Sequence, residues 1–110
     1  MNINEDEFAE LLSFYPEATV SQEAGSSYVL FPEITAIFAG VEKSVAALLC
    51  PMKHGGYSTR LFLSEPFLAR GQNWTEHFIL GRKWHTPSFN NVPETMSLLQ
   101  ILMAHLRHLK

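Results

Sequence analysis

A short segment late in the chain gathers the side chains best suited to chemistry. It reads Gly-Arg-Lys-Trp-His-Thr-Pro-Ser-Phe-Asn-Asn-Val-Pro over residues 81–93, so a histidine and a tryptophan stand beside two basic residues and two asparagines. Histidine acts as a general acid or base near neutral pH, and an asparagine amide can donate to a developing oxyanion. We therefore take His85, Asn90 and Asn91 as the candidate catalytic residues.

The same segment has a purely structural interpretation. Trp84 and Phe89 are large apolar side chains that can fill a core, and an asparagine pair is typical of a turn that caps a helix. If the segment is extended, Trp84 and His85 point to opposite sides, so that one is anchored in the core while the other faces outward. We expect this alternation to fix the imidazole, with Trp84 helping to form the binding site.

The single cysteine, Cys50, is the only thiol nucleophile in the chain. It follows the apolar residues 45–49, and we expect it at the end of a buried strand, where apolar surroundings raise the pKa of a thiol and leave it inert. Lys53 and His54 would lower that pKa if the next turn folded them back. We favour the structural role.

Two histidines near the end of the chain, His105 and His108, have a spacing that can place two imidazoles on one metal ion. The other three histidines, His54, His77 and His85, come from different predicted elements. Imidazoles near a helix C-terminus also complement the helix dipole, and we favour that role. We expect no metal and no cofactor.

Composition narrows the class of protein. The 110 residues are 46% hydrophobic and carry a net charge of −3, which predicts one ordered domain over residues 1–110. The balance of 11 acidic to 8 basic residues gives no electrostatic footprint for nucleic acid. No apolar run approaches the ~18 residues that span a bilayer. Because the acidic start lacks the order of a signal peptide, we expect a cytoplasmic protein.

The elements that position these residues follow from hydrophobic spacing. An apolar face over residues 8–15, capped by Asn4, predicts an N-terminal helix that ends before Pro16. Glycine and proline then separate short β-rich runs, which predicts an antiparallel meander of about four strands; the runs are residues 28–31, 34–38, 44–50 and 57–63. Residues 65–92 predict an irregular, aromatic-rich segment. A C-terminal helix with Pro93 near its first turn completes an α+β fold.

Apolar side chains cover a wide arc of that last helix. A single sheet covers only one side of a helix, so part of the arc is predicted to remain for a partner or for a second copy of the chain. The residues that we expect to serve this interface are Leu98, Ile101, His105 and Leu109.

Four stretches together carry a family resemblance: residues 28–32 (Tyr-Val-Leu-Phe-Pro), 48–51 (Leu-Leu-Cys-Pro) leading through 56–59 into Phe62, 81–85 (Gly-Arg-Lys-Trp-His) and the helix 98–109. In this order the chain resembles the divergent prokaryotic ubiquitin-conjugating-enzyme-like (UBC-like) proteins found beside ubiquitin-like modification genes. The resemblance covers most of the chain after Tyr28. It implies a UBC-like fold and, as partners, a ubiquitin-like modifier, a ThiF-like activating enzyme and a JAB-type peptidase.

The chain departs from the active members of that fold at the reacting residue. Their His-Pro-Asn motif is followed eight residues later by a thioester cysteine, whereas the positions eight beyond Asn90 and Asn91 are Leu98 and Leu99. Some divergent relatives keep a histidine where others keep the cysteine, and the resemblance assigns that position to His85.

Three functions compete at this point. The first is a UBC-like protein of a bacterial ubiquitin-like pathway, either a conjugating component without the standard cysteine or a catalytically inactive binding member. The second is an adaptor domain that binds another protein through its C-terminal helix and performs no chemistry. The third is a small hydrolase or metal-dependent enzyme that uses the histidines.

Overall fold

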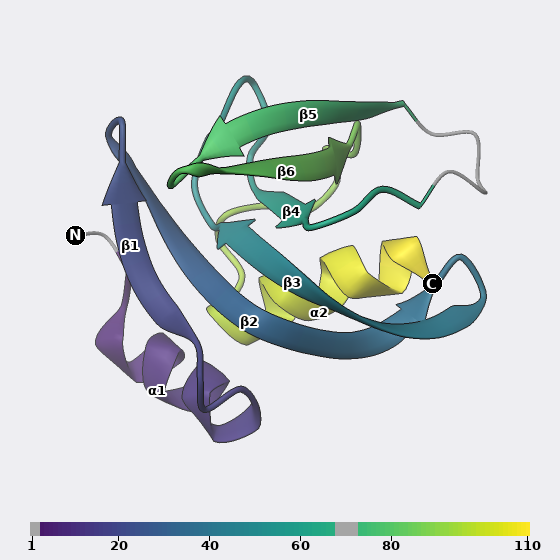
Figure 1. Ribbon diagram of the computed structural model, residues 1–110. Coiled ribbons are helices and arrows are strands. Elements are labelled where there is room, and N and C mark those ends of the chain that lie inside the picture. The colour runs from purple at the N-terminus through teal and green to yellow at the C-terminus, as the bar shows by residue number, and fades with distance from the viewer. Residues whose placement is uncertain (1–2, 68–72) are drawn as a thin grey trace.

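The structure, a computed structural model, describes residues 3–67 and 73–110. This part of the chain forms two helices and six strands in the order α1, β1–β6, α2 (Figure 1). Their bounds are α1 Glu5–Phe14, β1 Thr19–Glu23, β2 Ser26–Phe38, β3 Val41–Cys50, β4 Arg60–Leu63, β5 Trp74–Ile79, β6 Arg82–Pro87 and α2 Leu98–Leu109. The predicted α+β class, with a helix at each end of the chain and an antiparallel sheet between them, is confirmed.

The strands form one sheet in the order β1-β2-β3-β4-β6-β5, and every neighbouring pair is antiparallel. Strands β4 and β6 are joined through the single pair Leu63 and His85. The sheet curls strongly. Both carboxylate oxygens of Glu23, at the end of edge strand β1, accept from the backbone N–H of Leu80, each at 3.1 Å. Leu80 follows β5, the strand at the opposite edge, so the two edges of the sheet approach each other (Figure 1).

The number of strands differs from the expected four. The two runs 28–31 and 34–38 belong to one long strand, β2, which accommodates Pro32 at a β-bulge between Phe31 and Ile34. Proline is tolerated at such a bulge because the ladder hydrogen bond is already interrupted there.

The prediction of an irregular segment over residues 65–92 is wrong for much of its length. This segment contains the hairpin of β5 and β6, whose turn is Leu80-Gly81 with φ of 53° and 79°. Two successive residues with positive φ make the turn that suits the twist of a two-residue hairpin. Asn-Gly and Asp-Gly are the usual signals of this turn, and a leucine in the first position gives none.

Helix α1 begins where the sequence predicts. The side chain of Asn4 accepts from the backbone N–H of Glu7 at 3.0 Å, and three acidic residues occupy the first turn, which suits the positive end of the helix dipole. Leu11 is the fully buried residue of its inner face. The side chain of Glu7 also reaches the other helix, where it accepts from the backbone N–H of Leu98 at 3.1 Å.

Helix α2 begins later than Pro93, at Leu98. Ser97 is its N-cap and forms a capping box with Gln100, in which each side chain bonds the backbone N–H of the other residue. Residues 88–97 therefore form a connection over the end of the sheet rather than the first helical turn.

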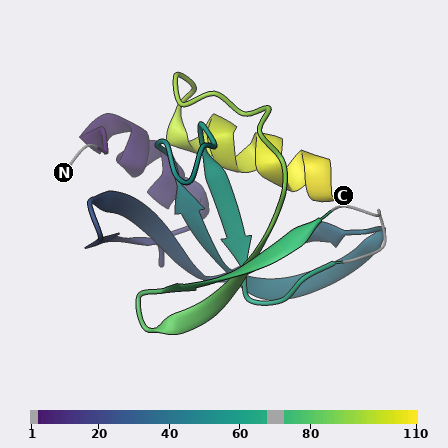
Figure 2. The same ribbon diagram turned by 90° about the horizontal axis from the view of Figure 1, so that it is seen from above.

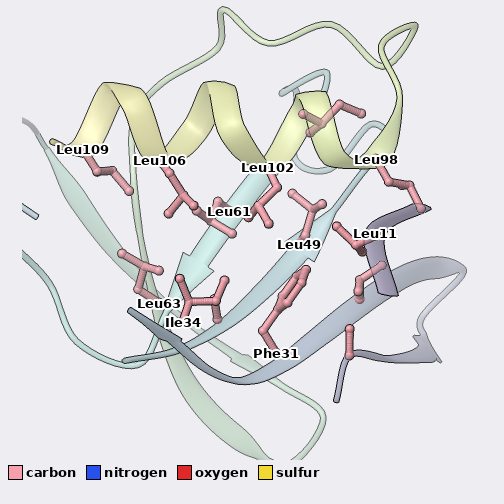
Figure 3. Close-up of a cluster of buried hydrophobic side chains, with 14 of the residues drawn as sticks. Leu11, Phe31, Ile34, Leu49, Leu61, Leu63, Leu98, Leu102, Leu106 and Leu109 are labelled. Carbon is pink, nitrogen blue, oxygen red and sulfur yellow. The ribbon is translucent and has the colours of Figure 1, made fainter. Parts of the chain in front are cut away.

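Both helices pack on the same face of the sheet (Figure 2), and the main core lies between these two layers. Figure 3 shows leucines of α2 pointing toward Phe31, Leu49 and Leu61 of the sheet. A second, smaller cluster covers the opposite face and receives no residue from either helix; it consists of Tyr28, Leu48, Cys50, Phe62, Ile79 and Trp84.

The four α2 residues that were expected to remain for a partner are not exposed. Leu98, Ile101, His105 and Leu109 are all buried within the chain. The sheet, helix α1 and the connection 88–97 each cover part of the helix, and the ring of Phe89 from that connection packs against His105. Neither helix in the described part of the chain has the length and apolar composition to cross a membrane.

Candidate functional site

Trp84 and His85 diverge on strand β6 as predicted for extended backbone. Trp84 is fully buried in the second cluster, and its indole N–H donates to the carbonyl of Ile79 at 3.1 Å. His85 points to the other face and pairs across the sheet with Leu63 and Glu76. Its side chain is 15% exposed, and Nδ1 lies 4.0 Å from a carboxylate oxygen of Glu76. His85 is thus held in place at the border between core and solvent.

The asparagine pair does not join His85. The side-chain oxygen of Asn90 accepts from the backbone N–H of Ser58 at 2.9 Å, so it fixes the segment between β3 and β4. Asn91 is exposed. In residues 3–67 and 73–110, no hydrogen bond or ion pair links either asparagine to His85. The geometry therefore assigns Asn90 a positioning role in a loop, and gives no oxyanion site at His85.

Cys50 is buried on the second cluster, at the end of β3. Its thiol donates to the carbonyl of Met52 at 3.4 Å. Burial raises the pKa of Cys50 to about 11, and the contact with Met52 only partly opposes that shift. A thiol in this state is almost entirely protonated at neutral pH, which makes it a poor nucleophile.

His105 is enclosed rather than available for metal or partner. Its Nε2 lies 2.9 Å from the hydroxyl of Thr59, and Phe89 packs edge-on against its ring. Burial, with a smaller effect of His108, lowers the pKa of His105 to about 4. No group of three or more histidine, cysteine or acidic side chains in the described part of the chain is placed to hold a metal ion.

The structure assembles a cluster that the sequence did not reveal. His54 from the segment between β3 and β4, Arg60 at the start of β4 and His77 on β5 surround Phe62 on the face away from the helices. The two imidazole centroids lie 6.2 Å apart, and each lies 5.4 Å from the ring of Phe62. The contact between these rings connects the segment that links β3 to β4 with β5. We call His54, Arg60 and His77 the His–Arg cluster.

Burial and the charge of Arg60 favour the neutral form of both imidazoles in the His–Arg cluster. Burial and then the charge of Arg60 lower the pKa of His54, partly offset by the backbone carbonyl of the same residue. Burial lowers the pKa of His77 too, with further contributions from Arg60 and His54. The Nε2 atom of His77 lies 2.9 Å from the hydroxyl of Thr75. The cluster therefore combines one fixed positive charge with two neutral rings.

Only one of these residues had a signal in the sequence. Arg60 and Phe62 lie two positions apart in a predicted strand, so their side chains share a face. His77 lies in the segment predicted to be irregular, where no face can be assigned. The approach of His54 to His77 depends on the pairing of β4 with β6, which joins residues far apart in the chain.

No protein-family model, curated protein or solved structure matches this chain.

Proposed function

We propose that this chain is a UBC-like protein of a bacterial ubiquitin-like modification pathway, and that it acts as a catalytically inactive binding member. The proposal combines the family resemblance with the buried state of the Cys50 thiol. The resemblance is carried by residues 28–32, 48–51 leading through 56–59 into Phe62, 81–85 and 98–109. An α+β fold with a helix at each end of an antiparallel sheet is compatible with it.

The observation that carries the inactive assignment is the burial of Cys50. Thioester transfer needs a thiolate that an activated modifier can reach, whereas Cys50 is enclosed and its pKa is raised to about 11. Leucines occupy the positions where the resemblance expects the reacting cysteine. These facts favour binding over group transfer by this chain.

His85 and the exposed residues beside it on the same face form the surface that we assign to the modifier. The register places Glu76 opposite His85 and Phe78 opposite Lys83, so all four side chains point to one side of the hairpin. Phe78 is 73% exposed, and charged Glu76 and Lys83 flank it. An exposed aromatic side chain with a polar rim is typical of a protein-binding surface.

The test uses a ubiquitin-like modifier and a ThiF-like activating enzyme, which are partners that the resemblance implies. We expect the modifier to bind the wild-type chain and the Cys50→Ser variant equally, with no adduct that a reducing agent releases. The His85→Ala and Phe78→Ala variants are expected to bind at least about tenfold more weakly. Phe14→Ala is the matched control, because Phe14 on α1 is also exposed, at 65%.

Two results would contradict the proposal. A reducible adduct that forms on the wild-type chain and is lost in Cys50→Ser would show a conjugating activity. Failure of the modifier, the activating enzyme and the JAB-type peptidase to bind at all would remove the pathway assignment.

The second candidate is an adaptor domain without a place in such a pathway. It is favoured by the exposure of four large apolar side chains in the described part of the chain, which are Phe14, Ile37, Val41 and Phe78. None of them lies on α2, so an adaptor would bind through the sheet or α1. Retention of binding to another protein, without binding to any of the three pathway partners, would select this candidate.

A further inference from the structure

Arg60 carries a positive charge inside the protein without a negative partner. Its residue is only 5% exposed. No carboxylate in the described residues lies within 4.0 Å of its guanidinium nitrogens, and no described residue accepts a hydrogen bond from it. Glu23, an acid near Tyr28 at the same face, is engaged by the backbone N–H of Leu80. Buried arginines are ordinarily paired, so this one requires a physical explanation.

The neighbours of the Arg60 guanidinium are aromatic rings and a glycine turn rather than oxygen acceptors. The guanidinium carbon lies 3.9 Å from the centroid of Tyr57 and 5.9 Å from that of Phe62. Aromatic rings stabilise the charge by cation–π attraction but accept none of its five N–H groups in the manner of an oxygen. The buried Nε of Arg60 has no hydrogen-bond partner, and neither has the buried Nδ1 of His54.

The turn beside Arg60 is held in shape by its own backbone. His54 and Tyr57 exchange two backbone hydrogen bonds of 2.9 and 3.0 Å, and Gly55 and Gly56 between them both have positive φ. A methyl group added at Gly55 would lie 3.6 Å from Nη1 of Arg60, so the turn closes directly against the guanidinium. The site is therefore organised in the absence of a ligand, which lowers the entropic cost of binding.

We propose that the His–Arg cluster binds an oxyanion group, a carboxylate or a phosphate, with Arg60 as its floor and the half-buried rings of His54 and His77 as its rim. The guanidinium fork matches the geometry of two oxygens of either group. The oxygens supply the negative charge that the buried guanidinium lacks among the described residues. This inference is independent of the proposed pathway function, because it concerns the opposite face of the sheet from His85 and its neighbours.

A bound anion also reverses the electrostatics of the rim. Arg60 contributes to the lowered pKa of both His54 and His77. A negative charge between the three groups offsets that effect and favours the protonated imidazoles. Binding of an anion at the cluster is therefore detectable as a change in the pKa of His54 and His77.

The experiment follows the imidazole signals of the full chain by NMR during titration with inorganic phosphate and, separately, with acetate at constant ionic strength. We expect saturable shifts at His54 and His77 and a rise of both pKa values by about half a unit or more. The Arg60→Gln variant should bind at least about tenfold more weakly. Arg82→Gln is the matched control, because Arg82 also stacks on an aromatic ring, that of Trp84, but is exposed.

Saturation with phosphate alone identifies a phosphoryl ligand, and saturation with acetate alone identifies a carboxylate; either result supports the site. Shifts that grow linearly with concentration, that spread equally over all histidines, or that persist in Arg60→Gln would overturn it. If Arg60→Gln does not fold, His77→Phe replaces it, because a phenyl ring preserves the packing on Phe62. Unchanged affinity in that variant would equally overturn the proposal.

Discussion

Thr59 and His105 share a buried hydrogen bond of 2.9 Å that ties the start of β4 to the middle of α2. The hydroxyl of Thr59 donates its one proton to the carbonyl of Val92 at 2.8 Å. It therefore accepts from His105, whose Nε2 must carry the hydrogen. The Thr59 side chain thus joins the sheet, the connection 88–97 and the helix. With the hydrogen on Nε2, the His105 ring is neutral as long as Nδ1 is unprotonated, and protonation of Nδ1 would place a charge in the core.

The first prediction concerns the pH dependence of stability. The pKa of His105 falls from 6.5 in the unfolded chain to about 4 in the folded one, so the unfolded state binds more protons between these values. Stability is complete above about pH 6.5 and is lost as the pH falls toward 4, by up to about 3 kcal/mol. His54 and His77 act in the same direction. Between pH 4 and 7, the free energy of unfolding measured with urea should depend less steeply on pH in His105→Gln than in the wild-type chain. Identical slopes for the two proteins would contradict this prediction.

The second prediction tests the hydroxyl itself. Thr59→Val preserves the shape of the side chain but leaves the carbonyl of Val92 and the N–H of His105 without partners, so we expect a loss of about 1–3 kcal/mol in the free energy of unfolding. Thr35→Val is the control, because the hydroxyl of Thr35 bonds Ser44 on the exposed surface. That change should stay within about 0.5 kcal/mol. Equal losses for the two variants in denaturant titrations would show that burial of the bond is irrelevant.

The sequence predicted the local features of the fold well. Asn4 capped the helix as its spacing with Glu7 indicated, and apolar residues preceding Cys50 correctly placed that thiol in the core. Extended backbone alone predicted that Trp84 and His85 diverge. These features depend on neighbours within a few residues, which a sequence displays directly.

What the sequence could not supply depends on contacts between distant residues. The curl that brings Glu23 to Leu80 closes the sheet over the second cluster. The packing of α1 and of the connection 88–97 on α2 buries side chains that an isolated helical wheel leaves exposed. The hairpin at Leu80 lacks the residue types that announce such a turn. The His–Arg cluster needs both long-range pairing and that hairpin, so no local pattern could have brought His54 and His77 together.

The third prediction is that Cys50 resists modification in the folded protein. With a pKa of about 11, only about one thiol in a thousand is ionised at pH 8, and the side chain is fully buried. A thiol-specific disulfide reagent should therefore react at the rate of unfolding, and denaturant should accelerate the reaction strongly. The single substitution Met52→Ala is a useful comparison, because Met52 packs beside Cys50. This substitution keeps the backbone carbonyl of residue 52, which accepts from the Cys50 thiol. Rapid labelling of the native wild-type chain at pH 7 would contradict the buried assignment.

The last prediction uses the turn between β1 and β2, where Ala24 and Gly25 have φ of 52° and 81°. Left-handed backbone is costly for alanine, whereas asparagine tolerates it, and Asn-Gly is the preferred pair for this turn. Because Ala24 is exposed and loses no packing, we expect Ala24→Asn to raise the free energy of unfolding by about 0.5–1 kcal/mol. The control is the same exchange at exposed Ala9 within α1, where asparagine lowers helix stability by about 0.5 kcal/mol. Opposite signs in denaturant titrations confirm that backbone conformation decides the outcome; stabilisation at neither position, or at both, would refute it.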